Sequence, residues 1–178
     1  MPDIYQQWKS EVVPAMMASR GYRNVMQVPR LLKIAVSTGI KSSVERDAFT
    51  EAKESLGLIT GQQPVITKSR MNVANFKLRK GMPVGVMVTL RGGRMYDFYD
   101  RFVHNVLPRI RDFRGVSAKG FDGSGNYNLG IEDVTVFTEI DPDKLKRQMG
   151  LNIAMITSAN SDDEARELLR LLEMPFAS

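Results

Sequence analysis

The sequence predicts an α+β fold: a single domain over residues 1–178, in which a mixed, mostly antiparallel sheet has helices packed on one face and carries a long basic loop. The chain has 178 residues, 43% hydrophobic and 25% charged, which is the composition of one globular domain with a proper core. Segments with a period of two residues and segments with a helical period both occur. Because they do not alternate strictly, a doubly wound parallel sheet is disfavoured.

The first expected helix has an apolar residue at every fourth position. These residues are Ile4, Trp8, Val12 and Met16. Gly21 can end this helix, and Pro14 inside it predicts a kink or an early break. A second helix follows further along, with Ala48, Ala52, Leu56 and Ile59 on one face and Gly61 at its end.

Two segments alternate with the period of a strand that has one buried face. In the first, we expect Leu32, Ile34, Val36 and Thr38 to be buried and Leu31, Lys33, Ala35 and Ser37 to face away from the core. In the second, we expect Val84, Val86, Val88 and Leu90 to be buried and Met87, Thr89 and Arg91 to face away. Helices on one side of the sheet would leave the polar face open, and an open face of this kind suits RNA.

The remaining elements are read in the same way. A short strand is expected at 64–68, and a third helix with Met95, Phe98, Phe102 and Val106 inward and Asp97, Arg101 and His104 outward. Residues 114–130 contain five glycines and predict a long loop. Strands are expected at 134–137 and 151–157. A last helix begins at Ser161, which forms a capping box with Glu164.

Basic residues are concentrated in the middle of the chain. Residues 66–119 contain 12 basic and 3 acidic side chains, a net charge of +9, whereas residues 1–65 have +2 and residues 120–178 have −6. Within this region, residues 68–81 contain five cations and no acid, mixed with amides and one aromatic ring. Such a segment would repel itself without a partner, so phosphate contact is the favoured interpretation and a solvated hairpin tip the alternative.

Several functional classes are disfavoured. The chain has no cysteine and one histidine, His104, which excludes disulfides and thiolate chemistry and makes a catalytic triad improbable. The glycines of 123–130 do not have dinucleotide-loop spacing, and no phosphate-binding loop motif occurs. We therefore expect no enzymatic activity, no catalytic residue, no cofactor and no metal. No stretch is long and apolar enough to cross a membrane, and residues 1–5 lack a signal-peptide pattern, so we expect a cytoplasmic location.

The sequence resembles the large-subunit ribosomal protein L-five family, which binds 5S rRNA. The matching segments run in order from about Tyr5 to Phe176. They are VMQVPR at 25–30, TGQ at 60–62, FKLR at 76–79, VTLRG at 88–92, PRIRDFRG at 108–115, FDG at 121–123, GNY at 125–127 and MPF at 174–176. PRIRDFRG and the FDGSGNY stretch are the most specific of these segments.

The resemblance implies a mixed sheet backed by helices and a role on the ribosome. The implied partners are 5S rRNA, large-subunit rRNA, peptidyl-site tRNA, other 5S rRNA-binding ribosomal proteins and a protein of the small-subunit head. The 5S rRNA would be tied into the central protuberance through Lys33, Ser37, Gln62, Lys68, Thr89, Arg91 and Arg94. The peptidyl-site tRNA would meet the loop 70–81 through Arg70, Asn72, Asn75, Lys77, Arg79 and Lys80. The bridge to the small subunit would involve Arg109, Arg111, Asp112, Arg114, Asp143 and Lys144.

Some positions depart from the family pattern. Ser37 replaces an asparagine, and Gln63, Met71 and Met87 stand where lysine is common, so fewer phosphates should be met. Lys80, at a position usually acidic or amide, restores one positive charge. An organellar version of the same protein and a stand-alone RNA-binding assembly factor are the alternative interpretations.

Overall fold

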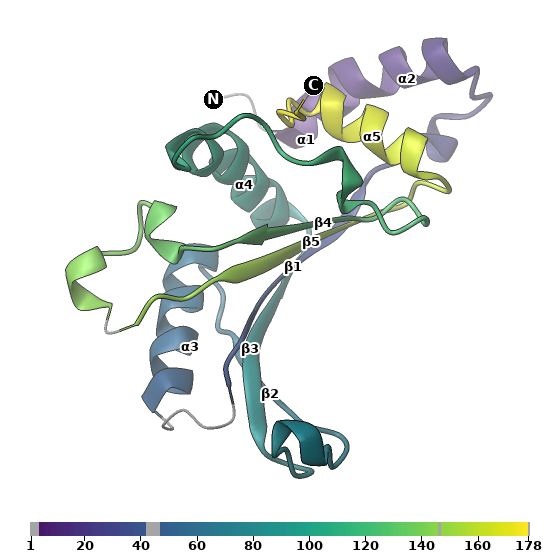
Figure 1. Cartoon of the computed structure of the whole chain (residues 1–178). Coiled ribbons are helices and arrows are strands. Elements are labelled where there is room, and N and C mark those ends of the chain that lie inside the picture. The colour runs from purple at the N-terminus through teal and green to yellow at the C-terminus, as the bar shows by residue number, and fades with distance from the viewer. Residues whose placement is uncertain (1–3, 42–46, 146, 178) are drawn as a thin grey trace. The chain divides into compact units, whose positions relative to one another are not determined.

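The computed structural model describes residues 4–41, 47–145 and 147–177, without the side chain of Lys144. Its helices are α1 (Ile4–Gln7), α2 (Val13–Arg20), α3 (Asp47–Thr60), α4 (Gly93–Arg101) and α5 (Asp162–Leu171) (Figure 1). Its strands are β1 (Leu31–Gly39), β2 (Val65–Lys68), β3 (Pro83–Leu90), β4 (Tyr127–Ile131) and β5 (Leu151–Thr157). They form a five-stranded sheet in the order β2-β3-β1-β5-β4, which confirms the α+β fold class.

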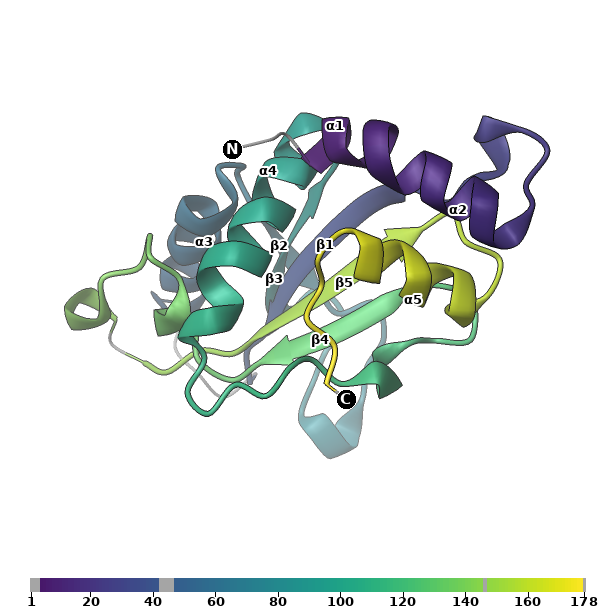
Figure 2. The same ribbon diagram turned by 90° about the horizontal axis from the view of Figure 1, so that it is seen from above.

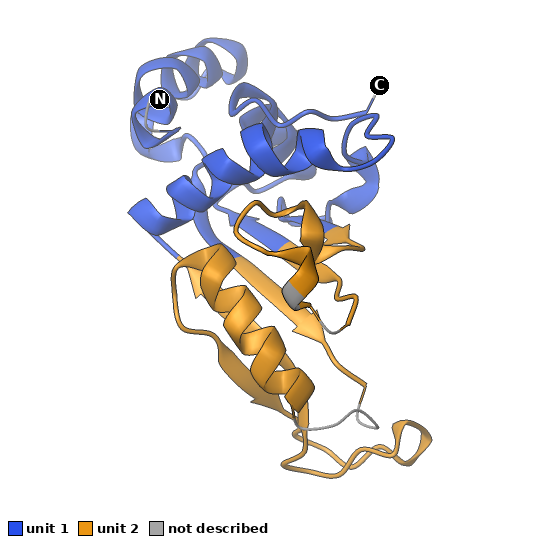
Figure 3. Cartoon of the chain, turned by 90° about the vertical axis from the view of Figure 1, so that its left-hand side faces the viewer, with its two compact units in different colours: residues 1–34, 91–129, 154–178 blue, residues 35–90, 130–153 orange. Residues whose placement is uncertain are grey.

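Contacts within the chain divide it into two compact units (Figure 3). Unit 1 comprises residues 1–34, 91–129 and 154–178, and unit 2 comprises residues 35–90 and 130–153. The single domain expected from the length stays a prediction. Each unit is described by itself below.

In unit 1, residues 4–20 form one continuous helix, because a wider π-helical turn at 8–12 joins α1 to α2 (Figure 2). The predicted apolar face is buried along its whole length. Pro14 does not break the helix. Proline removes one N–H from the helical ladder, and the wider turn just before it, closed by the Val13 N–H on the Trp8 carbonyl, accommodates that loss. The helix ends at Gly21 as predicted, with φ of 65°.

The third predicted helix is also confirmed in unit 1, where α4 continues through turns as far as Arg109. Its predicted inward side chains are buried, and Phe98 and Phe102 stack with ring centroids 6.0 Å apart. The fully buried Tyr99 donates a hydrogen bond from its hydroxyl to the Leu172 carbonyl over 3.2 Å. Burial raises the pKa of Tyr99 far above its ordinary value, so this hydroxyl stays a donor.

Residues 121–126 form an ordered turn built on two carboxylates of unit 1. Asp122 accepts hydrogen bonds from the backbone N–H groups of Ser124 and Asn126, at 2.9 and 3.1 Å. The Asn126 amide also donates to Asp122 and is the main cause of its lowered pKa. Asp162, at the start of α5, accepts from two more N–H groups of the turn. Asp122 and Asp162 therefore stabilise the turn 121–126, and Asp162 links this turn to the start of α5.

Two sequence predictions about the second half of the chain were wrong. The predicted loop 114–130 contains most of β4, because pairing with β5, which a local period does not reveal, makes residues 127–131 a strand. The predicted strand 134–137 is a 3-10 turn at Val134–Val136. The side chain of Asp133 caps this turn by accepting from the Thr135 N–H over 2.9 Å, which offers the backbone an alternative to a strand ladder.

In unit 2, the helix α3 packs against β3 and β2. Its predicted apolar face is buried, and it ends at Gly61, with φ of 63°. The strands β2 and β3 are antiparallel, with Val65 opposite Met87 and Ile66 opposite Val86. A β-carbon on Gly85 would lie 2.4 Å from the backbone oxygen of Thr38, so only glycine lets β3 approach β1 this closely.

Replacing Gly85 by alanine should destabilise the protein by about 1 to 3 kcal/mol, because the backbone of Thr38 must move away. Urea unfolding followed by circular dichroism measures this free energy. Gly130→Ala is the matched control, since a β-carbon there would lie 3.8 Å from its nearest neighbour. Equal free energies of unfolding for the two variants would contradict the close approach.

His104 joins three segments of unit 1. Its Nδ1 lies 2.8 Å from the Asp100 carboxylate and its Nε2 lies 2.9 Å from the Glu173 carboxylate, which also accepts from the Gln7 amide over 3.1 Å. The hydrogen bond with Glu173 is the main cause of both the raised pKa of His104 and the lowered pKa of Glu173. Protonated His104 therefore stabilises the folded state.

Because the pKa of His104 is raised on folding, its contribution should be present below the unfolded value of about 6.5 and be lost as pH rises through the folded value. His104→Gln should lower the free energy of unfolding at about pH 6 by about 0.3 to 1 kcal/mol, a range reduced by exposure to solvent. At about pH 9 the difference should vanish. A difference independent of pH, measured by urea unfolding, would mean that the charge of His104 makes no contribution.

Candidate nucleic-acid interface

The outward face of β3 in unit 2 carries both polar and apolar side chains, as the alternation predicts. Val86, Val88 and Leu90 are buried as predicted, whereas Val84 at the start of the strand is only half-buried. Met87 is 40% exposed and Thr89 is half-buried. Val65 lies opposite Met87 and is also exposed. The predicted order of β1 holds from Lys33 to Thr38, although Leu31 is buried and Leu32 exposed, which reverses the expectation at the start of that strand.

Gln62 and Thr89 are brought together in unit 2. The Gln62 side-chain amide donates a hydrogen bond to the Thr89 backbone carbonyl over 3.1 Å. Gln62 is itself positioned at the end of α3, where its own carbonyl accepts from the Thr60 hydroxyl over 3.2 Å. The contact fixes the Gln62 side chain beside β3. The sequence pattern does not predict this hydrogen bond, because 27 residues separate Gln62 from Thr89.

The seven residues predicted to meet 5S rRNA belong to both units. Ser37, Gln62, Lys68 and Thr89 lie in unit 2, and Lys33, Arg91 and Arg94 lie in unit 1. Lys33 and Ser37 are half-buried on the same side of β1, where side chains alternate. Lys68, Arg91 and Arg94 are exposed. Among the described residues, none of these four cations takes part in an ion pair.

The basic loop of unit 2 is a hairpin, with more order than its sequence indicates. Val73 and Leu78 exchange two backbone hydrogen bonds of 3.0 Å each, around a 3-10 turn at Ala74–Phe76. At the base of the hairpin, the Ser69 N–H bonds to the Met82 carbonyl over 2.8 Å. The Asn72 side chain accepts from the Lys80 N–H over 2.7 Å. Asn72 therefore shapes the hairpin as well as lying on its surface.

The hairpin presents its cations and two apolar side chains to solvent. Met71 and Phe76 are each 71% exposed. The backbone bonds between Val73 and Leu78 hold the hairpin together, and the Phe76 ring lies largely in solvent. The exposed cations are Arg70, Lys77, Arg79 and Lys80, and none of them forms an ion pair within the described ranges. This arrangement offers positive charge and a ring for stacking at one place.

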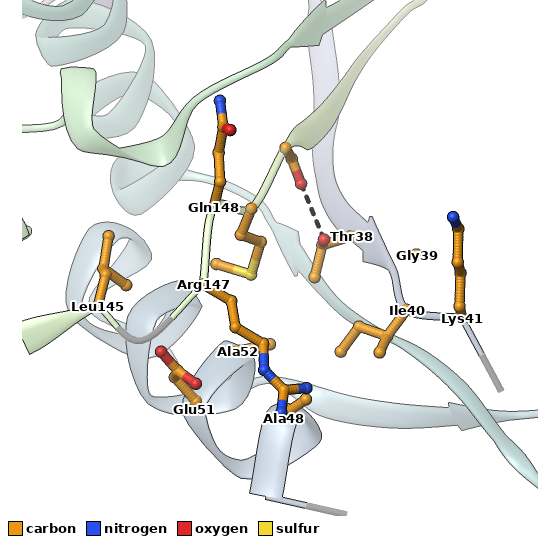
Figure 4. Close-up of a pocket in the computed structure, with 12 residues that line it drawn as sticks. Thr38, Gly39, Ile40, Lys41, Ala48, Glu51, Ala52, Leu145, Arg147 and Gln148 are labelled. Carbon is orange, nitrogen blue, oxygen red and sulfur yellow. Dashed lines mark hydrogen bonds between the residues drawn. The ribbon is translucent and has the colours of Figure 1, made fainter. Parts of the chain in front are cut away.

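Two of the hollows in unit 2 lie at the end of β1. One, of about 590 Å³, lies between the end of β1 and the hairpin, and Lys41, Asn75 and Lys77 contribute to its lining. The other, of about 200 Å³, lies beside the start of α3, where the Thr38 hydroxyl donates to the Gly150 carbonyl over 2.8 Å (Figure 4). No group of acids and histidine among residues 4–41, 47–145 and 147–177 could hold a metal ion.

The residues predicted to bridge the subunits are also divided. Arg109, Arg111, Asp112 and Arg114 are exposed in unit 1, and Asp143 is exposed in unit 2. The Lys144 side chain lies outside the described part of the chain. The arginine segment ends at Gly115, where a β-carbon would lie 2.6 Å from the Ala177 nitrogen, so the C-terminal segment limits how the arginine segment can move.

Known proteins similar to this chain were found by comparison. A family model for the C-terminus of the ribosomal L5 family matches residues 83–176, and one described as Ribosomal protein L5 matches residues 24–79. Relatives named large ribosomal subunit protein uL5 include that of Alkaliphilus oremlandii, 50% identical over 178 residues and covering 99% of both chains. Those of Rhodopirellula baltica and Desulfosudis oleivorans are each 51% identical over 177 residues, covering 99% of this chain and 90% and 99% of their own.

No helix within the described residues is both long enough and apolar enough to span a membrane. The expectation of a ribosomal protein rather than an enzyme is confirmed by these relatives, which carry the name of a ribosomal protein. Matches over nearly the whole length, at about half identity, show that the chain belongs to the ribosomal protein L5 family.

Proposed function

We propose that the chain is a structural component of the large ribosomal subunit in the cytoplasm and anchors 5S rRNA in the central protuberance. Family membership supports the ribosomal role, since its relatives are named as proteins of the large subunit. The observation that carries the RNA-binding role is the exposure of Lys68, Arg91 and Arg94 without ionic partners within the described residues. Exposed cations without an ionic partner can bind phosphates without first breaking an ion pair within the protein, so less binding free energy is lost.

The hydroxyl of Thr89 and the amide of Gln62 supply the short-range part of this interface. The Gln62 amide is held against β3 by its bond to the Thr89 carbonyl. Fixed polar groups on an open sheet suit the wide minor groove of A-form RNA, which displays 2′-hydroxyl groups. Such groups are ordered before RNA binds, so binding loses less side-chain entropy. Large-subunit rRNA and other 5S rRNA-binding ribosomal proteins complete this set of partners.

The loop 70–81, at the tip of the hairpin, contacts the peptidyl-site tRNA. It is separated from Thr89 by most of β3, about 20 Å at the rise of a strand, so the tRNA contact is distinct from the Thr89 part of the 5S rRNA interface, whereas Lys68 lies at the base of the hairpin. The exposed bridge residues of both units contact a protein of the small-subunit head. The mixed charge of Asp143 and Lys144 suits a protein surface better than a polyanion.

A stand-alone RNA-binding assembly factor and an organellar version of the protein are the competing functions. Sedimentation of ribosomal subunits in high salt distinguishes a subunit component from an assembly factor, because the component remains bound and the assembly factor washes off.

Arg91→Ala should weaken binding to 5S rRNA and reduce the salt slope of log affinity by about 1, since one phosphate contact is lost. Filter binding over a series of salt concentrations measures this slope. The control is Arg170→Ala, which removes another exposed arginine of unit 1 from the surface of α5. An unchanged slope would remove Arg91 from the phosphate contacts.

Thr89→Val should weaken 5S rRNA binding by about 1 to 2 kcal/mol and leave stability nearly intact, because it deletes a hydroxyl on the open face and keeps the shape. Thr50→Val, an exposed threonine of α3, is the control for the same chemical change. Filter binding and thermal melting give the two quantities. If Thr89→Val unfolds the protein without a direct effect on RNA, the open-face assignment fails.

Replacing Lys77, Arg79 and Lys80 together by alanine should speed tRNA dissociation from assembled ribosomes and leave 5S rRNA affinity within a few-fold of wild type. The reason is that the hairpin cations lie at the opposite end of β3 from Thr89. Replacement of Lys9, Lys119 and Arg170, three exposed cations of unit 1, controls for the same loss of net charge. Unchanged tRNA dissociation would leave the hairpin without this role.

A further inference from the structure

Residues 23–27 of unit 1, called here the 23–27 turn, hold two neighbouring apolar side chains in solvent. Met26 is 79% exposed, the highest value among the exposed large hydrophobic side chains of the described residues, and Val25 is 48% exposed. Neither side chain belongs to the buried core. No residue before Lys33 takes part in the proposed function, so the exposure of this pair has no explanation there.

The turn is rigidly built. The Asn24 side-chain oxygen accepts from the Met26 N–H over 2.9 Å, and the Gln27 side-chain oxygen accepts from the Arg23 N–H over 3.1 Å. The Gln27 N–H in turn bonds to the Asn24 carbonyl over 3.0 Å. Met26 is therefore presented in one defined place.

The residues that follow the turn are fixed to the core of unit 1. The Pro29 carbonyl accepts from the buried Trp8 indole over 3.0 Å. Arg30 exchanges two hydrogen bonds of 3.0 Å with Ser158, through its N–H and its carbonyl. Binding at such a site loses little conformational entropy, because the backbone is already ordered.

The polar groups of the turn are suited to a partner rich in hydrogen-bond acceptors. The side-chain oxygens of Asn24 and Gln27 are occupied by backbone N–H groups, so their amide NH₂ groups, which are donors, remain for a partner. Arg23 and Arg30 are exposed and form no ion pair with any described residue. The sequence has no acidic residue from Val12 to Lys33.

We infer that the 23–27 turn is a separate RNA-contacting element, in which Met26 packs against the ribose or base face of an rRNA strand while Arg23 and Arg30 meet its phosphates. RNA supplies phosphate, ribose and base oxygens as acceptors beside flat apolar surfaces, which matches donors, cations and an exposed thioether side chain. An acidic protein would also match the positive charge. Such a protein would receive Met26 in an apolar pocket, and that pocket would not tolerate a lysine substituted at position 26, which makes the two kinds of partner distinguishable. The inference rests on the proposed function only in that the chain enters the large subunit.

Photocrosslinking tests this contact in the complete subunit. The photoreactive amino acid p-benzoylphenylalanine is placed at position 26 of the full chain, and large subunits are purified from cells and irradiated. A crosslink to 5S rRNA or to the large rRNA, identified by primer extension, is expected, and the extension product tells the two RNAs apart. A crosslink to protein alone, or none, would overturn the inference. The same photoreactive residue at Leu58, a 64% exposed position of α3, is the control.

Charge substitutions at the same position give an independent readout. Met26→Glu should lower the fraction of protein retained on subunits after a high-salt wash several-fold, whereas Met26→Lys should keep it within about twofold of wild type. Both variants should fold, since the side chain is exposed. Equal losses for the two variants would indicate an apolar pocket of a protein and overturn the inference, and no loss in either would exclude a contact. If wild type fails to bind free 5S rRNA while the crosslink to the large rRNA persists, the proposed 5S role fails and this inference stands.

Discussion

The close approach of β3 to β1 is the constraint on which unit 2 depends. At Gly85 the backbone oxygen of Thr38 occupies the space that any β-carbon would fill, so the two strands can pair only around glycine. This pairing fixes which side chains of β3 face α3 and which face solvent. Thr89 and Met87 are on the open face because Val86 and Val88 are held in the core. A slip of one residue would exchange the two sets.

The electrostatic design separates two kinds of cation. Arg20 is paired with Glu167 over 2.6 Å, and the hydrogen bond that the Arg20 guanidinium donates to this carboxylate raises the pKa of Arg20, so its charge serves the fold of unit 1. The cations of the hairpin have no such partner among the described residues. Their mutual repulsion is offset in the free protein only by solvent, salt and the backbone bonds of the hairpin. A polyanion removes the repulsion, which is why these positions suit RNA and the paired one does not.

The sequence by itself determined the features that depend on neighbouring residues. Helical spacing marked α3 and the buried face of residues 4–16, glycines marked the ends at Gly21 and Gly61, and Ser161 marked the start of α5, where its hydroxyl accepts from the Glu164 N–H. The resemblance of its motifs to a known family also indicated the ribosomal role.

Tertiary structure decided the features that depend on distant partners. β4 exists because β5 pairs with it, although its own residues look like a loop. Phe76 is 71% exposed on a hairpin that the backbone bonds between Val73 and Leu78 hold together. The bond from Gln62 to Thr89 joins positions 27 residues apart. Local patterns report the conformation that a segment prefers, whereas pairing, exposure and side-chain contacts are settled only when the chain folds and each buried polar group finds its partner.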